Sequence, residues 1–276
     1  MSTFRASAGW TQEWANFGFA VDDGVATITL DRPDKLNALT LDVYADLRDL
    51  LTEIEHRDDV AVVVITGSGK GFCSGGDVDD IIGELLEHGD NRRVVEFTRM
   101  TGAVVQRLRE LPRPVIAAVN GTAAGAGAVI ALASDFRVLS RSASFRFLFT
   151  KVGLAGADMG CAYLLPRLVG LGRATEILML GDKVTADEAL AIGLATRVVA
   201  DDLLVGEAHA LARRLADGPT FAYAATKMLL TRELDMSLPA AIEMEAWVQA
   251  LLMRSDDHAE FYRAFTQGRD PNWTGR

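Results

Sequence analysis

The chain has 276 residues, of which 49% are hydrophobic and 24% are charged, and its formal net charge is −10 at pH 7. This composition is typical of a globular protein with a sizeable core and excludes a predominantly disordered chain. The acidic charge disfavours nucleic acid as a partner.

Cysteines, histidines and apolar runs exclude further classes of protein. Cys73 and Cys161 are the only cysteines; they are too few for a disulfide framework and favour a reducing compartment. The four histidines lack metal-ligand spacing, so we expect no metal site. No window reaches the roughly 18 apolar residues of a membrane span, and the N-terminal sequence lacks the apolar core of a signal peptide. We therefore expect a cytoplasmic protein without a membrane segment.

The N-terminal part of the chain predicts a hairpin, a helix and a buried strand. Residues 19–30 hold Asp22-Asp23-Gly24 between two apolar runs, which is a hairpin signal. Residues 41–55 repeat apolar side chains with helical spacing, and Thr40 is placed to cap that helix. Residues 60–66 form a short β-branched apolar run, which is typical of a buried strand.

Two strand–loop–helix units with glycine-rich loops come next. The strand at 60–66 runs into the loop 67–77, and Asp77 is a candidate cap for a helical region over 78–111 that is interrupted at 88–91. The second unit begins with an apolar strand at 115–119, ends it at Asn120-Gly121, and starts a helix among Gly125, Ala126 and Gly127.

The start of that second helix offers an anion or oxyanion site made of main chain. Its first N–H groups have no helical acceptor and carry partial positive charge, and small residues let an oxygen come close. Close helix packing is the competing interpretation. The glycines at 121, 125 and 127 do not have the GxGxxG spacing of a dinucleotide site. Two such units can aim two N–H groups at one oxygen, which is how an oxyanion hole is built.

The rest of the chain continues the alternation and then becomes helical. Strands are expected at 136–139, 143–149 and 196–199, and helices at 173–180 and 185–192. In the strand at 143–149, Phe145, Phe147 and Phe149 alternate and should share one face. From about residue 203 the pattern is helical, over 204–215, 220–230, 238–253 and 259–266, with Asp257 as a possible cap of the last helix. This order indicates an α/β domain followed by helices.

Four segments in this order resemble the enoyl-CoA hydratase/isomerase (crotonase) superfamily. They are 31–39, 71–77, 114–121 with the following glycines, and 165–170, and the resemblance extends over roughly residues 19–200. It implies an α/β fold of the crotonase (ClpP-like) type, a ββα superhelix with a C-terminal helical region. Residues 1–200 would form an acyl-CoA-binding core and residues 201–276 a helical trimerisation region, giving a homotrimer or a hexamer built as a dimer of trimers.

The resemblance also assigns a binding site for an acyl-CoA. The two oxyanion N–H groups fall on Gly76 and Ala126; most relatives have glycine at the second position, but alanine serves if its φ is negative. Phe265 matches a phenylalanine that closes the adenine pocket of a neighbouring subunit, and Arg269 is a possible substitute for a lysine of the family. The CoA moiety would lie against Lys35, Leu36, Ala38, Ser74, Asp77 and Val78.

The chain departs from the family hydratases at both catalytic glutamates, which fall on Val129 and Phe149. Hydration by a pair of carboxylates is therefore disfavoured. Asp158 lies in a loop that resembles those of dienoyl-CoA isomerases, ring-altering enoyl-CoA isomerases and 4-chlorobenzoyl-CoA dehalogenase. Its apolar neighbours would desolvate the carboxyl group and raise its pKa, which suits a base. Alternatively, Asp158 caps a helix that starts near Met159.

We therefore expect an enzyme that shifts a double bond in an unsaturated acyl-CoA, with Asp158 carrying the proton and no cofactor beyond the CoA thioester. Phe149 predicts an apolar wall suited to aromatic or bulky acyl groups. Three alternatives stay open: hydration by a non-standard carboxylate, a thioesterase or dehalogenase-type reaction with Asp158 as nucleophile, and a non-catalytic scaffold. Glu84, Glu87 and His88 are the reserve proton carriers, and the dehalogenase's histidine falls near Arg93.

Overall fold

The computed structural model describes residues 9–11, 13–88 and 90–276. Two sheets organise the chain. The larger has the order β1-β2-β3-β5-β7-β10, with β1 and β2 antiparallel and the other pairs parallel. The smaller has the order β4-β6-β8-β9. The strands are β1 (Phe17–Asp22), β2 (Val25–Leu30), β3 (Val62–Gly67), β4 (Gly71–Cys73), β5 (Val115–Val119), β6 (Thr122–Ala124), β7 (Phe136–Ser140), β8 (Ser144–Arg146), β9 (Val184–Thr185) and β10 (Arg197–Val199).

The chain repeats a ββα unit. β3, β5 and β7 lie side by side in the larger sheet, and each is followed at once by a strand of the smaller sheet, β4, β6 and β8. Helical segments then return the chain to the larger sheet. This arrangement is the superhelix that the family resemblance implied.

Most of the predicted helices are confirmed within a few residues. Thr40 caps α1, accepting a hydrogen bond from the Val43 N–H. α5 was expected only from the alternative role of Asp158. The helices are α1 (Leu41–Ile54), α2 (Glu84–His88), α3 (Asn91–Glu110), α4 (Ala126–Ala133), α5 (Cys161–Val169), α6 (Leu171–Leu180), α7 (Ala186–Ala191), α8 (Leu204–Ala216), α9 (Thr220–Arg232), α10 (Leu238–Leu252) and α11 (Asp256–Gln267).

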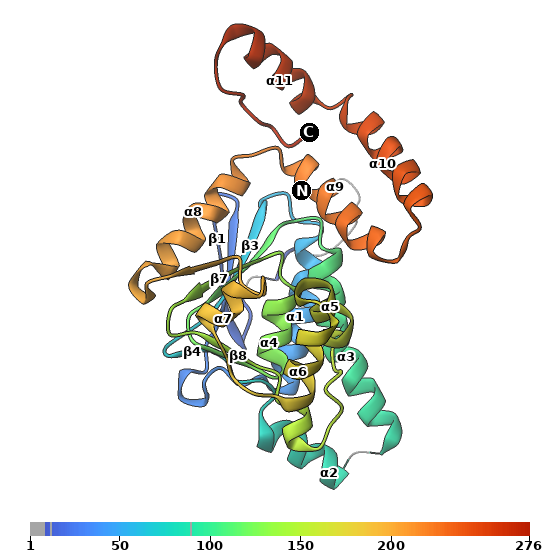
Figure 1. Ribbon diagram of the computed structural model, residues 1–276. Helices are drawn as coiled ribbons and strands as arrows, with labels where there is room; N and C mark the ends of the chain where they lie inside the picture. Colours follow the sequence, from blue (N-terminus) through green and yellow to red (C-terminus); the bar gives the residue numbers. More distant parts are fainter. Residues whose placement is uncertain (1–8, 12, 89) are drawn as a thin grey trace.

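Strands β3 and β5 are buried on both faces, as their continuous apolar runs predicted. In β3, Val63 and Ile65 join the main core, whereas Val62 and Val64 pack with α8 on the other face of the sheet. Helices therefore cover the sheet on both sides (Figure 1). The first helix of the C-terminal region, α8, is thus part of the packing of the sheet.

Two sequence-based predictions about element ends were wrong. The strand expected over 143–149 ends at Arg146, and a 3₁₀-helical segment occupies Leu148–Val152. Phe145 and Phe147 are stacked in the core, but Phe149 belongs to the helical segment, so the expected alternation stops. The last helix is capped by Ser255 and not by Asp257, whose carboxylate instead accepts hydrogen bonds from the Thr274 and Gly275 N–H groups.

The last two helices, α10 and α11, extend away from the sheets (Figure 1). They expose large apolar side chains, including Trp247 and, at 74% exposure, Phe265. Within the described part of the chain, no helix is long and apolar enough to cross a membrane.

Candidate active site

Two glycine-containing loops lie against each other where β4 and β6 end. These strands pair in parallel, with Gly71 opposite Thr122 and Cys73 opposite Ala123. A Cβ atom built on Gly75, whose φ is 101°, would lie 3.1 Å from the Ala124 carbonyl oxygen and 3.5 Å from the Ala126 nitrogen. The loop at 75–76 is therefore next to the start of α4.

Glycine is required for this approach on the α4 side as well. A Cβ atom on Gly127 would lie 2.6 Å from the Cβ of Cys73, which is closer than two carbon atoms can pack. The small-residue cluster thus serves close packing of the second loop against the first. This packing and an oxyanion site are compatible, because the same contact brings the two loops together.

Both predicted oxyanion groups are N–H groups that the local backbone does not use. Leu39 donates to the Gly75 carbonyl oxygen and accepts from the Asp77 N–H, each at 2.8 Å. These two hydrogen bonds leave the Gly76 N–H between them unused. Ala126 is the first residue of α4, where an N–H has no helical acceptor. Among the described residues, neither N–H has a hydrogen-bond acceptor.

The conformation at Ala126 meets the condition set from the sequence. Gly125 takes the positive φ, 50°, and Ala126 is not among the residues with positive φ. The helix that follows is fully buried, so the partial positive charge of its N-terminus lies in a region of low polarity. A thioester oxygen placed between the two loops would meet two main-chain donors.

Asp77 caps the π-helical turn Val78–Gly83, as predicted, and it also binds Arg32. Its carboxylate accepts hydrogen bonds from the Asp79 and Asp80 N–H groups and lies 3.0 Å from the Arg32 guanidinium. Burial acts to raise the pKa of Asp77, but these N–H groups and Arg32 outweigh it, so the pKa lies below its ordinary value. Sequence reasoning missed Arg32, since an arginine in a loop gives no sign of its partner.

The predicted CoA-binding residues of the two loops lie together. The Ser74 hydroxyl donates to the Lys35 carbonyl oxygen at 3.1 Å, and the Ser74 N–H donates to the Leu36 carbonyl oxygen at 2.9 Å. Leu36 and Val78 are 43% and 64% exposed, and Lys35 is exposed beside Asp79, whereas Ala38 is buried. These residues form a rim beside Gly76 that is partly apolar and carries one cation.

Phe265 and Arg269 lie at the far end of the molecule from this rim, in and just after α11 (Figure 1). Phe265 stacks on Phe261, with ring centroids 6.0 Å apart, and Arg269 is paired with Glu260 at 2.6 Å. Within one chain the two residues are therefore separated from the other predicted CoA-binding residues.

Asp158 does not cap a helix, so that alternative is wrong. α5 begins at Cys161 with Gly160 as its N-cap residue, and no side chain caps it. The Asp158 N–H donates to Cys161 Sγ at 3.4 Å, and the thiol donates to the Gly156 carbonyl oxygen at 3.2 Å. Met159, the next residue, has a φ of 49°, which is strained for a residue with a side chain.

The surroundings of Asp158 favour its neutral form. Burial raises the pKa of its carboxyl group above the ordinary value, and the Met159 N–H offsets this only in part. A carboxylate in such surroundings is a stronger base than one in water. The geometry is that of a half-buried base on a fixed loop.

Buried apolar side chains occupy the two positions at which the family hydratases have glutamate. Val129 is completely buried in α4, and Phe149 is 8% exposed.

The reserve carboxylate Glu84 is paired with Arg93 at 2.6 Å. Glu87 lies on α2 and is not free of contacts, and the His88 side chain lies outside the described part. No group of side chains that could hold a metal ion is found in the part of the chain that the structure describes.

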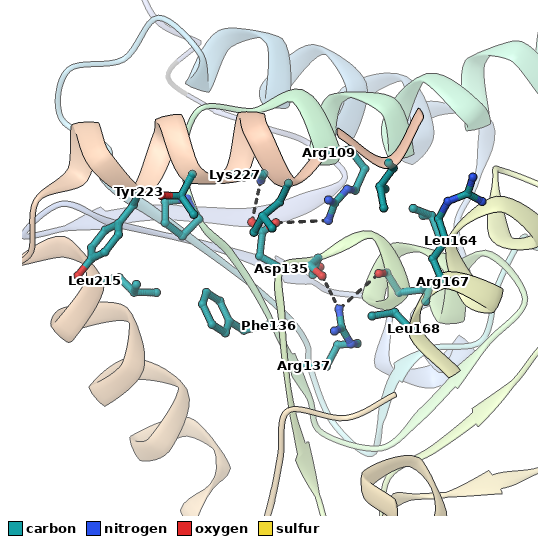
Figure 2. A pocket seen from close by; sticks show the side chains of 16 residues that line it. Arg109, Asp135, Phe136, Arg137, Leu164, Arg167, Leu168, Leu215, Tyr223 and Lys227 are labelled. Carbon is teal, nitrogen blue, oxygen red and sulfur yellow. Dashed lines mark hydrogen bonds and ion pairs between the residues drawn. The ribbon is translucent and has the colours of Figure 1, made fainter. Parts of the chain in front are cut away.

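A separate cavity of about 370 Å³ lies between α9 and the core and contains Asp135 (Figure 2). The Asp135 carboxylate accepts from the Val115 N–H at 2.8 Å and pairs with Lys227 at 2.7 Å and Arg109 at 3.4 Å. These contacts tie α9 to β5 and α3, so we interpret them as structural.

The model of the enoyl-CoA hydratase/isomerase family matches residues 20–276. The chain is 38% identical over 260 residues to the 1,2-epoxyphenylacetyl-CoA isomerase of Escherichia coli K12, covering 93% of this chain and 97% of that protein. It is 40% identical over 260 residues to a candidate enoyl-CoA hydratase of Rhodobacter capsulatus, with coverage of 94% and 97%.

A solved structure is closer still. The crystal structure of a candidate enoyl-CoA hydratase from Streptomyces coelicolor A3(2) superposes with a TM-score of 0.98 at 59% identity, and each chain is covered completely. The match to the family model and these similarities over nearly the whole length, together with the paired loops and the ββα repeat, show that the chain belongs to the enoyl-CoA hydratase/isomerase family of the crotonase superfamily.

Proposed function

We propose that this member of the family isomerises an unsaturated acyl-CoA by moving a double bond, with Asp158 as the proton carrier. The observation that carries the proposal is the contrast between three positions. The two glutamate positions hold Val129 and Phe149, whereas Asp158 is a half-buried carboxyl group with a raised pKa. A single base suits a reaction that removes one proton and returns it.

The reaction conserves all atoms of the substrate. The thioester oxygen accepts hydrogen bonds from the Gly76 and Ala126 N–H groups. Asp158 removes a proton from the α or γ carbon, the electron pair of that C–H bond moves into a dienolate, and Asp158 returns the proton to the other carbon. Each main-chain donor contributes about 3 kcal/mol to the enolate, the scale of a single oxyanion donor. The reaction needs no cofactor beyond the CoA thioester.

The acyl group that we propose is aromatic or otherwise bulky. Phe149 gives an apolar side chain where hydratases have a carboxylate, and such a surface favours an apolar acyl group. The name of the E. coli relative, 1,2-epoxyphenylacetyl-CoA isomerase, supports this choice because its acyl group carries a phenyl ring.

The assembly that we propose is a homotrimer, or a dimer of trimers, in the cytoplasm. The CoA moiety would lie along Lys35, Leu36, Ala38, Ser74, Asp77 and Val78. Phe265 and Arg269 would reach the adenine from a neighbouring subunit, which is consistent with their distance from these residues within one chain. The exposed apolar faces of α10 and α11 supply surface for such contacts.

Hydration is the second candidate, favoured by the names of the Rhodobacter and Streptomyces relatives. A panel of unsaturated aliphatic and aromatic acyl-CoAs, incubated with the protein in D₂O and followed by mass spectrometry, separates the candidates. We expect deuterium uptake and a shifted double bond without a gain of water. A gain of water would show hydration, and release of free CoA would show a hydrolase with Asp158 as nucleophile. A protein that neither binds nor converts any acyl-CoA would be a scaffold.

A further inference from the structure

Tyr44 is a buried tyrosine whose hydroxyl group has no hydrogen-bond partner in the part of the chain that the structure describes. It lies on α1, is only 2% exposed, and packs edge-to-face against Phe97 with ring centroids 6.1 Å apart. Among the described residues, none forms a hydrogen bond with its Oη, and this oxygen is not one of the fully enclosed side-chain atoms that lack a partner, so it borders open space. Buried tyrosine hydroxyls normally have a partner, because an unpaired polar group in the core is unfavourable.

The Tyr44 hydroxyl lies at the turn that carries the first predicted oxyanion group. A Cβ atom built on Gly76 would lie 3.8 Å from Tyr44 Oη. The charge of the Asp158 carboxylate also acts on the hydroxyl and helps to raise its pKa. The polar end of the side chain therefore lies beside the predicted oxyanion turn.

The hydroxyl also keeps its proton. Burial is the main cause that raises the pKa of Tyr44 well above its ordinary value, and the neighbouring Cys73 and Asp158 add to it. A neutral phenol is a hydrogen-bond donor, and the group most in need of a donor at this turn is an oxygen that gains negative charge. Among the described residues, no hydrogen bond joins Asp158 to this hydroxyl, and the carboxyl group of Asp158 accepts from the Met159 N–H.

We propose that the Tyr44 hydroxyl donates a third hydrogen bond to the thioester oxygen, beside the N–H groups of Gly76 and Ala126. Tyr44 would then be a further catalytic residue, and this inference rests on the proposed function. The hydroxyl transfers no proton and only stabilises the enolate while Asp158 holds the substrate's proton. A phenylalanine would pack equally well against Phe97, so packing alone gives no reason for the hydroxyl.

The test is Tyr44→Phe, which removes one oxygen atom and keeps the ring. We expect the rate of isomerisation and of deuterium exchange to fall about 10²-fold, the loss seen for one oxyanion donor. KM and the affinity for a saturated acyl-CoA should change little. The midpoint of thermal unfolding should change little, because the substitution removes no hydrogen bond within the described part of the protein. Tyr223→Phe, which removes a hydroxyl at the cavity that contains Asp135, is the matched control and should keep wild-type activity.

Several results would overturn the inference. A Tyr44→Phe variant with wild-type exchange would overturn it while leaving the proposed function in place. A fall in the unfolding midpoint or a failure to fold would assign the hydroxyl a structural role. A loss confined to substrates with an oxygen on the acyl chain would assign it to acyl recognition. If the wild-type protein itself catalyses no exchange with any acyl-CoA, the proposed function fails and this inference fails with it.

Discussion

The thiol of Cys161, at the start of α5, accepts a hydrogen bond from the Asp158 N–H at 3.4 Å. The same thiol donates to the Gly156 carbonyl oxygen, so one buried side chain holds both ends of the short loop that carries the proposed base. Burial raises the pKa of this thiol, which keeps it neutral and able to donate. A catalytic group needs a fixed position, and this contact supplies one for Asp158.

The first prediction concerns Asp158 as the base. Asp158→Asn keeps the size of the side chain but removes the proton acceptor, so turnover and deuterium exchange should fall by about 10²-fold or more. Affinity for CoA should not change, because the rim around Lys35 and Ser74 is untouched. Glu84→Gln is the matched control, since it neutralises a carboxylate that is paired with Arg93 and should keep activity. A fully active Asn variant would show that another group carries the proton.

The second prediction concerns pH. The pKa of Asp158 is raised in the folded protein, so the acid limb of the activity profile should lie above the ordinary aspartate value of about 3.9. A raised folded pKa means that the folded state binds this proton more tightly than the unfolded chain does. Asp158 therefore favours folding at pH below its unfolded pKa, and this contribution is lost as the pH rises through its folded pKa.

It follows that Asp158→Asn should be as stable as the wild type or more stable at neutral pH. The difference in unfolding midpoint should shrink as the pH falls below the ordinary range of a carboxyl group. Thermal unfolding at a series of pH values measures this. An Asn variant that is less stable than the wild type at neutral pH would contradict a destabilised carboxylate at this position.

The third prediction concerns the acyl pocket. Phe149→Glu places a charge in an apolar wall, which is unfavourable without a partner. We expect kcat/KM for an aromatic acyl-CoA to fall more than kcat/KM for a short straight-chain one. Phe149→Leu keeps the wall apolar and serves as the control. An unchanged ratio of the two substrates in Phe149→Glu would mean that this residue does not line the pocket.

The fourth prediction concerns the contact between the two loops. Gly127→Ala should lower the free energy of unfolding by about 1–3 kcal/mol, the usual effect of overpacking, because its Cβ would collide with Cys73. Gly172→Ala on α6 is the control: its Cβ would meet nothing within 4 Å, and alanine favours a helix. Urea unfolding measures both. Equal stabilities of the two variants would argue against the close approach of the loops.

The fifth prediction concerns assembly. Analytical ultracentrifugation should show a trimer or hexamer at micromolar concentration, and a stable monomer would contradict the proposed neighbour contact. In the assembled protein, Phe265→Ala should weaken CoA binding without changing the sedimentation coefficient. Phe261→Ala, one helical turn earlier, tests whether any loss is particular to Phe265 or common to the aromatic surface of α11.

The sequence by itself determined the elements whose signals are local. Residues 115–119 form β5 because a short β-branched run closed by Asn-Gly can hardly form a helix. The sequence also predicts the helix that starts after Gly125, because the strand pattern changes to a run of small residues within a few positions. The absence of glutamates at Val129 and Phe149 needed only the order of the residues. These features depend on neighbours along the chain, which the sequence shows directly.

The tertiary structure decided which distant groups meet. The three-residue strands β4 and β6 give no periodic signal in the sequence, because they are too short and too rich in small residues. Their pairing nevertheless brings Gly76 beside Ala126, fifty positions later in the chain. The sequence is compatible with Asp158 as a base or as a helix cap, and only the start of α5 at Cys161 excludes the cap. Packing between elements also determines the partners of Asp77 and Asp135 and the place of the Tyr44 hydroxyl beside Gly76. No local pattern encodes such contacts.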